Sequence, residues 1–159
     1  MIAAGQHFPP FSLPNQNEKT VSLGDFAGRW LVVYVYPKDD TPGCTAQGRG
    51  FTAAKEEFDR ANIGIVGLNQ HPIDSHKQFC DKFQFTIDLL SDTTGEVLGR
   101  LGVAQREWYG KLYWDRTTFV VDPEGIVRRV YTDVKPEGHE RVILRDITAM
   151  QAARRQAGG

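Results

Sequence analysis

The sequence predicts an α/β protein in which helices cover both faces of a central mixed β-sheet. Two uninterrupted apolar runs, WLVVYVY (30–36) and IGIVGLN (63–69), are typical of strands buried on both faces. Each run is followed by a segment with helix-start signals. The segment 117–131 (TTFVVDPEGIVRRVY) has two apolar strands around a Pro-Glu-Gly turn and predicts a hairpin. The order strand, helix, strand, helix, hairpin, helix therefore predicts a single mixed sheet.

The N-terminal part of this pattern starts with a short strand at 19–23 (KTVSL) and a turn or single helical turn at 24–26. After the run 30–36, Thr41 suits an N-cap and Pro42 suits the first helical position, where the missing N–H costs nothing. A helix is therefore expected from this point to about residue 60.

Cys44 falls in the first turn of that helix. Cys44, Phe51 and Phe58 follow one another at intervals of seven residues, so they share one stripe that faces the sheet. Gly48 and Gly50 weaken the first half of the helix by about 1 kcal/mol each relative to alanine. We expect this end of the helix to unwind easily.

Helices are also predicted in the second half of the chain. Ser75 and Gln78 form a capping-box pattern that opens a helix reaching about Phe83, with Cys80 near its middle. The segment 92–103 (DTTGEVLGRLGV) predicts a short helix ended by glycine. Three apolar residues of the last segment share one helical face: Ile143, Ile147 and Met150.

Length and charge limit the possible classes of protein. The 159 residues suffice for one domain with a sizeable core, and we expect residues 1–159 to form a single domain. Lys and Arg number 19 against 20 Asp and Glu, so the net charge of -1 gives no reason to expect binding to nucleic acid or to a membrane. No targeting segment or long apolar stretch is present, and we expect a soluble, cytoplasmic protein.

The position of Cys44 favours chemistry. A thiolate is the reactive form of cysteine, and a helix N-terminus supplies partial positive charge and unpaired N–H groups that favour it. Two cysteines do not resemble a secreted disulfide framework, and in a reducing compartment such a pair is more often catalytic or metal-binding. The alternative is that Cys44 is a small core residue.

Two sequence blocks carry a family resemblance. The first is Pro37-x-x-x-Thr41-x-x-Cys44 within YPKDDTPGCT, and the second is RTTFVVDPEGIV (116–127). With the opening FSLPNQNEKTVSLGDFAGRWLVVYVYPKD, the chain resembles a peroxiredoxin, in particular the bacterioferritin comigratory protein or peroxiredoxin Q branch, over nearly its whole length. The resemblance implies a thioredoxin-like fold and reduction of hydrogen peroxide and organic hydroperoxides with electrons from thioredoxin. No cofactor or metal is expected.

The same resemblance implies the roles of four residues. Cys44 is the peroxidatic cysteine, which attacks the peroxide, and Pro37, Thr41 and Arg116 complete its pocket. The permanent charge of Arg116 favours the thiolate and offsets the charge that develops on the departing oxygen. The Thr41 hydroxyl can cap the helix or turn toward the sulfur. Without the motif, Arg116 would be interpreted as a surface charge and Thr41 as a plain N-cap.

The chain differs from many relatives in its resolving cysteine, which attacks the oxidised Cys44. Those relatives carry it five residues after the peroxidatic cysteine, where this chain has Arg49. Cys80, thirty-six positions after Cys44 (80 minus 44), matches a subset of the family and is assigned the resolving role in an intramolecular disulfide. The alternatives are inert packing beside Phe79 and Phe83, or a one-cysteine mechanism.

The disulfide requires motion. Two helix-borne sulfurs bond only when their Cα atoms lie within about 7 Å, so we expect one helix end to unwind on oxidation, with the Cys44 helix as the better candidate. The resemblance to this branch of the family favours a monomer. The aromatic stretch 107–114 (EWYGKLYW) has three interpretations: an edge of the peroxide pocket, a surface for the reductant, or a packed loop.

Three other functions compete with the peroxidase. A thiol–disulfide oxidoreductase normally uses Cys-x-x-Cys, but Gln47 occupies the second position. A metal site could use His76 and Cys80 with His71 or Cys44, at irregular spacing. A redox sensor would use the same Cys44 chemistry. The two remaining histidines, His7 and His139, are expected on the surface.

Overall fold

The computed structural model describes residues 1–158 and has a five-stranded central sheet of order β5-β4-β3-β8-β9. The strands β3, β4 and β5 are parallel, while β8 and β9 run antiparallel to their neighbours, so the sheet is mixed, as predicted. Their bounds are Trp30–Val35 (β3), Ile63–Asn69 (β4), Asp88–Ser91 (β5), Thr117–Val121 (β8) and Val127–Tyr131 (β9).

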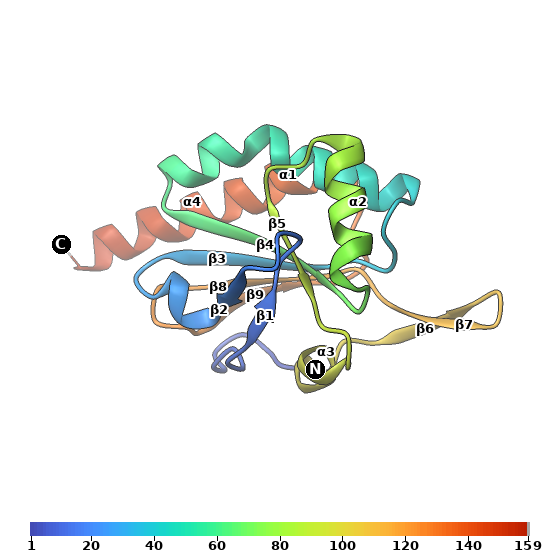
Figure 1. Cartoon of the computed structure of the whole chain (residues 1–159). Helices are drawn as coiled ribbons and strands as arrows, with labels where there is room; N and C mark the ends of the chain where they lie inside the picture. The colour runs from blue at the N-terminus through green and yellow to red at the C-terminus, as the bar shows by residue number, and fades with distance from the viewer. Residues whose placement is uncertain (159) are drawn as a thin grey trace.

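Helices lie on both faces of this sheet, which confirms the predicted fold class (Figure 1). One face is covered by α1, α2 and α4, and the other by the short helix α3 and the N-terminal segment. The helix bounds are Pro42–Arg60 (α1), Ile73–Phe83 (α2), Glu96–Leu101 (α3) and His139–Gly158 (α4). The N-terminal segment contains β1 (Ser12–Pro14), β2 (Thr20–Ser22) and the 3-10 turn η1 (Leu23–Phe26). No helix of residues 1–158 is long and apolar enough to cross a membrane.

The central strand β3 separates two hydrophobic cores. Trp30, Val32 and Tyr34 pack under α1, α2 and α4, while Leu31 and Val33 face the opposite core with α3. Because successive side chains of a strand point to opposite faces, a strand covered on both faces must be apolar throughout. The uninterrupted run WLVVYVY is explained by this position.

One sequence prediction about the helices needs correction, and several strands were missed. The helix α2 begins at Ile73 with Pro72 as its N-cap, so Ser75 lies inside the first turn and does not cap it. The Ser75 hydroxyl donates instead to Asp39 Oδ2 at 2.7 Å. Three elements were also missed: β1, β5 and the hairpin formed by β6 (Gln105–Trp108) and β7 (Lys111–Trp114).

Gly48 and Gly50 allow close packing of α1. A Cβ atom at Gly48 would overlap the Phe85 ring, and one at Gly50 would overlap the Glu140 carboxylate. The helix α1 is continuous through both residues. These glycines therefore let α1 approach its neighbours closely, whatever their effect on unwinding.

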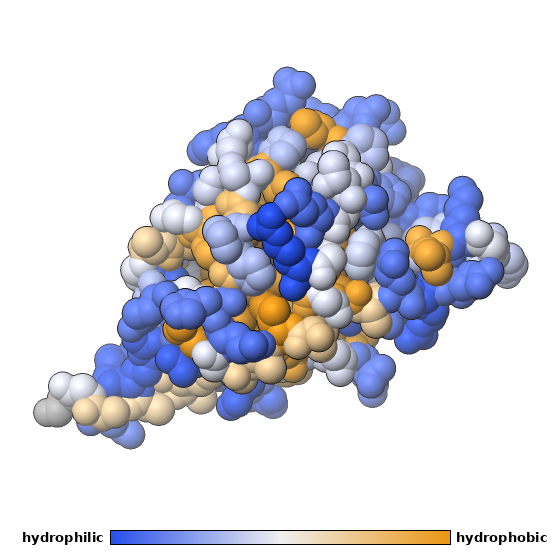
Figure 2. Space-filling model, turned by 90° about the horizontal axis from the view of Figure 1, so that it is seen from below, coloured by the Kyte–Doolittle hydropathy of each residue, from blue (hydrophilic) through white to orange (hydrophobic). Residues whose placement is uncertain are grey.

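The hairpin β6–β7 projects from the body of the protein (Figures 1 and 2). The face shown in Figure 2 is mostly hydrophilic, with hydrophobic groups reaching the surface in its middle and on the projecting hairpin. Three of the exposed large hydrophobic side chains belong to this hairpin: Trp108, Tyr109 and Leu112.

His139 is buried, and its predicted surface position is wrong, whereas His7 is exposed as predicted. The imidazole of His139 packs edge-on against Phe51 and Tyr131, and its Nε2 lies 2.8 Å from Thr118 Oγ1. Burial, with a smaller contribution from the Arg116 charge, lowers the pKa of His139 to about 4.

We expect His139 to make the protein less stable in mild acid. The unfolded chain takes up the imidazole proton near pH ~6.5, and the folded chain only near the pKa of about 4. Stability is therefore fully present above pH ~6.5 and falls by up to about 3 kcal/mol as pH decreases to ~4. Urea unfolding between these limits should give a flatter pH profile for His139→Gln than for the wild type. His7→Gln should follow the wild type, and parallel profiles for all three proteins would contradict the assignment.

Candidate active site

Cys44 lies in the first turn of α1, as predicted. The chain leaves the sheet at the end of β3, crosses the loop 36–41 and enters α1 at Pro42. The Cys44 side chain is only 2% exposed and belongs to the core that also contains Tyr34, Phe51 and Cys80. Both cysteines are free thiols in this structure.

Thr41 occupies the N-cap position without capping the helix through its side chain. Its Oγ1 donates instead to the Lys38 carbonyl oxygen at 2.9 Å. Thr41 is thus the N-cap residue, as predicted, but of the two roles left open for its hydroxyl, capping the helix is not the one observed. Because the hydroxyl donates its hydrogen in this contact, its oxygen lone pairs remain free to accept a hydrogen bond from a ligand.

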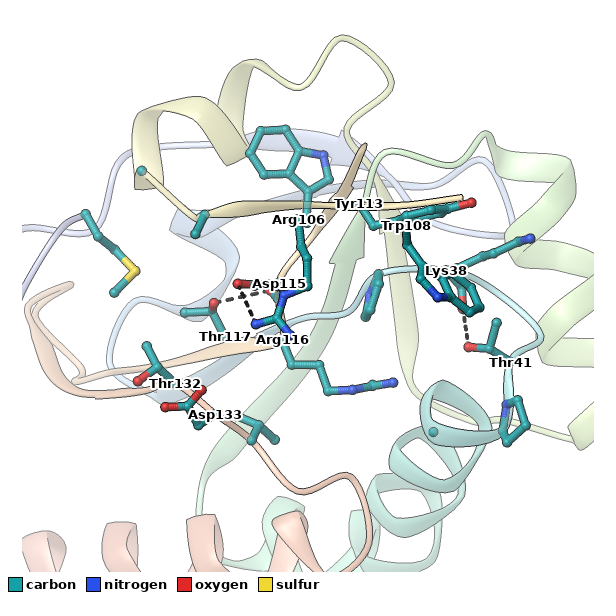
Figure 3. A pocket seen from close by; sticks show the side chains of 18 residues that line it. Lys38, Thr41, Arg106, Trp108, Tyr113, Asp115, Arg116, Thr117, Thr132 and Asp133 are labelled. Atoms are coloured by element: carbon teal, nitrogen blue, oxygen red, sulfur yellow. Dashed lines mark hydrogen bonds and ion pairs between the residues drawn. The ribbon is translucent and has the colours of Figure 1, made fainter. Parts of the chain in front are cut away.

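Arg116 lies against the first turn of α1. It directly precedes β8, and the pairing of Val35 with Thr117 brings the start of β8 beside the end of β3. The Arg116 Nη1 donates to Gln47 Oε1 at 2.9 Å, and a Cβ at Gly43 would stand 2.5 Å from Arg116 Nη2. Arg116 thus lies beside Gly43 and Gln47 of α1, one residue before and three residues after Cys44. Figure 3 shows the Arg116 side chain pointing toward the start of this helix.

Gln47, which stands where a Cys-x-x-Cys motif would have its second cysteine, accepts the hydrogen bond from Arg116. It is completely buried, and its Nε2 has no hydrogen-bond partner. Gln47 follows Cys44 by three residues, so the two side chains share one helical face. This spacing is the feature of the sequence from which a place for Gln47 beside Cys44 could have been predicted.

A pocket of about 730 Å³ opens beside this turn (Figure 3). Its walls come from the loop before α1, the hairpin β6–β7, the start of β8 and the segment 132–134. The predicted site residues Pro37, Thr41 and Arg116 all line it, together with Gly43. Cys44 itself is buried behind the residues that line the pocket.

Aromatic and cationic side chains form the outer wall of the pocket. Trp108, Tyr113 and Trp114 line it, so the aromatic stretch 107–114 does edge the predicted peroxide site. Arg106 also lines the pocket and pairs with Asp115 at 3.1 Å. The wall can therefore contact an apolar substituent of a ligand.

Cys80 lies in the C-terminal half of α2, and it is 4% exposed. Burial raises the pKa of its thiol to about 12, with further increases from the charges of Asp39 and Asp81. Tyr34 belongs to the same core as both cysteines, and burial raises its pKa. In this packed state Cys80 is protonated and hence a poor nucleophile.

His76, considered above as a metal ligand, uses both ring nitrogens elsewhere. Its Nδ1 lies 2.7 Å from Asp39 Oδ2, and its Nε2 lies 3.0 Å from the Leu90 carbonyl oxygen. Among residues 1–158, no three His, Cys, Asp or Glu side chains are grouped so that they could hold a metal ion.

Comparison with known proteins identifies the family. The model of the AhpC/TSA family matches residues 4–130. The peroxiredoxin Bcp of Xanthomonas campestris pv. campestris is 39% identical over 143 residues, which are 88% of this chain and 88% of that protein. The chain belongs to the peroxiredoxin family. Peroxiredoxins of this branch are thiol peroxidases, and this protein is therefore a peroxidase.

Solved structures agree with this peroxiredoxin assignment. Xylella fastidiosa PrxQ, crystallised as a Cys-to-Ser mutant, superposes with a TM-score of 0.90 at 26% identity over 95% of this chain and 98% of that chain. The X. campestris bacterioferritin comigratory protein, studied for its alkyl peroxide reduction activity, gives 0.82 at 35% identity over 88% and 91%. X. campestris peroxiredoxin Q was also solved with either of two cysteines mutated, 36 positions apart (84 minus 48).

The contact between Arg116 and Gly43 yields a test of the site. In Gly43→Ala the new Cβ would stand 2.5 Å from Nη2 and must displace the guanidinium from the first turn of α1. We expect the rate constant for reaction with hydrogen peroxide to fall at least about tenfold, because small misplacements of a catalytic group are costly. This rate constant is measured by following the oxidation of the reduced protein by hydrogen peroxide in a stopped-flow instrument.

The matched control for that experiment is Gly99→Ala in α3, where an added Cβ meets no atom within 4 Å. This variant should react at the wild-type rate. A wild-type rate in Gly43→Ala would show that the position of the guanidinium does not limit the reaction.

Proposed function

We propose that Cys44 is the peroxidatic cysteine of this peroxidase and that Pro37, Thr41 and Arg116 form its peroxide pocket. The observation that carries this proposal is the arrangement around Cys44: a cysteine in the first turn of a helix, with a guanidinium against that turn and a pocket on its outer side. The N-terminus of α1 and the Arg116 guanidinium both place positive charge at the turn that holds the Cys44 sulfur, where it favours a negatively charged sulfur.

The reaction follows from this arrangement. The Cys44 thiolate attacks one peroxide oxygen, an S–O bond forms, and the O–O bond breaks. The products are the Cys44 sulfenic acid and the alcohol or water formed when the departing oxygen takes up a proton. Arg116 offsets the negative charge that grows on this oxygen. The Thr41 hydroxyl donates its hydrogen to the Lys38 carbonyl oxygen, so its oxygen can accept a hydrogen bond from a peroxide O–H.

Cys80 is proposed as the resolving cysteine. The Cys80 thiol gives up its proton, its thiolate attacks the sulfenic sulfur of Cys44, and an intramolecular disulfide forms. The S–O bond breaks, and the leaving hydroxide takes up a proton and departs as water. The two cysteines share one core, and their separation of 36 (80 minus 44) equals that of the mutated cysteines in X. campestris peroxiredoxin Q. Because Cys80 is buried and protonated in this structure, local unwinding must expose it before it reacts.

A dithiol reductant of the thioredoxin class is proposed to return the disulfide to the two thiols. Exchange begins with attack by the reductant's thiolate on one sulfur of the disulfide, which local unwinding makes accessible. We propose that residues 1–159 act as one domain, as a monomer and in the cytoplasm. The last point needs a direct test, because the related Sedum lineare peroxiredoxin Q is chloroplastic.

Turnover tests both cysteine roles. Peroxide-dependent NADPH consumption with thioredoxin and its reductase should be lost in Cys44→Ser and in Cys80→Ser. Intact mass after one equivalent of peroxide should show a disulfide in the wild type and a sulfenic acid in Cys80→Ser. Full turnover in Cys80→Ser would remove Cys80 from the cycle. A wild-type protein that forms the disulfide without turning over would require a different reductant.

The pocket supports organic hydroperoxides as substrates, because its aromatic wall can pack against their substituents. Trp108 lines the pocket and is 57% exposed, and an aromatic contact is worth about 1 kcal/mol, or about fivefold in rate. We expect Trp108→Ala to lower kcat/KM for cumene hydroperoxide about fivefold and to leave hydrogen peroxide unaffected.

Leu112→Ala is the control for the aromatic wall, since Leu112 is 63% exposed in the same hairpin and does not line the pocket. It should leave both rate constants unchanged. An equal loss for the two peroxides in Trp108→Ala would mean that Trp108 acts on the fold of the site and not on the substituent.

A further inference from the structure

A buried ion pair joins the loop before Cys44 to the helix that carries Cys80. The Asp39 carboxylate, 4% exposed, lies in that loop, and the fully buried His76 lies in α2. Asp39 Oδ2 and His76 Nδ1 are 2.7 Å apart. The second nitrogen, Nε2, faces the Leu90 carbonyl oxygen at 3.0 Å. Both ring nitrogens of His76 thus lie against hydrogen-bond acceptors, and Nδ1 is also 3.4 Å from Tyr36 Oη.

Asp39 also receives three further hydrogen bonds, which favour its charged form. Tyr36 Oη donates to Oδ1 at 2.6 Å, Asn69 Nδ2 to Oδ1 at 3.2 Å, and Ser75 Oγ to Oδ2 at 2.7 Å. Burial alone would raise the pKa of Asp39, but the contacts with His76, Tyr36 and Ser75 outweigh it and the pKa lies below its ordinary value. The ion pair is thus fully hydrogen-bonded, the condition under which a buried charge is tolerated.

The ion pair lies one helical turn from Cys80. His76 and Cys80 are four residues apart in α2 and both are buried, so they share the inner face of the helix. Asp39 also adds to the raised pKa of Cys80, so its charge acts on that thiol. Any movement that exposes Cys80 through unwinding of α2 must stretch or break the contact between Asp39 and His76.

A second ion pair connects the same two segments at the surface. Lys82 Nζ lies 2.9 Å from Asp40 Oδ2, and both side chains are about half exposed. Exposed pairs of this kind contribute little, whereas removing one partner of a buried pair leaves an uncompensated charge. The buried pair is therefore the stronger connection.

We propose that the Asp39–His76 ion pair, here called the latch, holds α2 in its packed position and thereby sets how fast Cys80 resolves oxidised Cys44. This proposal rests on the proposed roles of the two cysteines. Asp39 and His76 act as positioning residues and do not touch the peroxide. Release of the latch lets the first part of α2 unwind and brings the Cys80 sulfur to Cys44.

The latch controls a competition between two reactions of the Cys44 sulfenic acid. In one, Cys80 attacks the sulfenic sulfur, water leaves and the disulfide forms. In the other, the sulfenate attacks a second peroxide, whose O–O bond breaks, and Cys44 becomes a sulfinic acid while the peroxide leaves as alcohol or water. A tight latch slows the first reaction and so favours the second at high peroxide concentration.

Asp39→Asn is the principal test, because the amide is isosteric and can still hydrogen-bond to His76 and Ser75 but carries no charge. The variant and the wild type are treated with increasing hydrogen peroxide, and intact mass gives the ratio of disulfide to sulfinic acid. This ratio does not depend on the rate of the first oxidation. We expect the latch variant to raise it about tenfold, equivalent to a loss of about 1.4 kcal/mol of latch energy.

Ser75→Ala provides a milder variant for the case in which Asp39→Asn does not fold. It removes one of the four hydrogen bonds to Asp39 while keeping both charges. We expect the ratio to rise about threefold. Two controls should leave it unchanged: Lys82→Gln, which breaks the exposed pair, and Ile147→Val, which loosens the core in α4 away from the latch.

The outcomes separate the latch from the proposed function. A higher ratio in Ser75→Ala and Asp39→Asn, with both controls at the wild-type value, supports the latch. An unchanged or lower ratio in Ser75→Ala overturns it, and so does an equal rise in Ile147→Val, which would show a general loss of stability. If the wild type forms no disulfide between Cys44 and Cys80, the proposed resolving role fails before the latch is tested.

Discussion

The antiparallel pairing of β3 with β8 is the constraint on which the active site depends. Val35 lies opposite Thr117, so the end of one central strand meets the start of the other at the same edge of the sheet. The loop that leads to Cys44 and the residue Arg116 are placed together by this register. A slip of one residue would turn the side chains of β8 to the opposite faces and move Arg116 away from α1.

Much of the fold could be predicted because its signals are local. The strand 63–69 and the helix from Pro42 to Arg60 have the bounds that their apolar runs and N-terminal signals predict. The short strand β5 was missed because only four residues form it, too few for a clear apolar pattern, and its pairing with β4 supplies the strand geometry. The hairpin β6–β7 was missed because it is exposed and shows no apolar alternation.

The candidate site could be predicted in part. The motif around Cys44 and the block 116–127 identified Pro37, Thr41 and Arg116, which line the pocket. These residues could be predicted because they belong to the two blocks on which the family resemblance rests. The partners of Arg116 and Asp39 could not be predicted, since Gln47 and His76 are distant from them in sequence and their contacts depend on the packed sheet. Ser75 shows the same limit: its capping pattern is local, yet a buried carboxylate 36 residues earlier (75 minus 39) takes its hydroxyl.

The contacts around the two cysteine helices decide which one moves on oxidation. The sequence favoured α1 because of Gly48 and Gly50, but these glycines fit α1 closely against Phe85 and Glu140, and α1 also carries the turn that binds Arg116. Unwinding α1 would therefore dismantle the peroxide site together with its packing. The helix α2 has no side-chain cap at its N-terminus and is held there by polar contacts to one carboxylate. Unwinding α2 would break these buried contacts and expose Phe79, which packs edge-on against Phe85, but none of these residues lines the pocket. The pocket beside Cys44 therefore stays intact when α2 unwinds, and we propose α2 as the helix that moves.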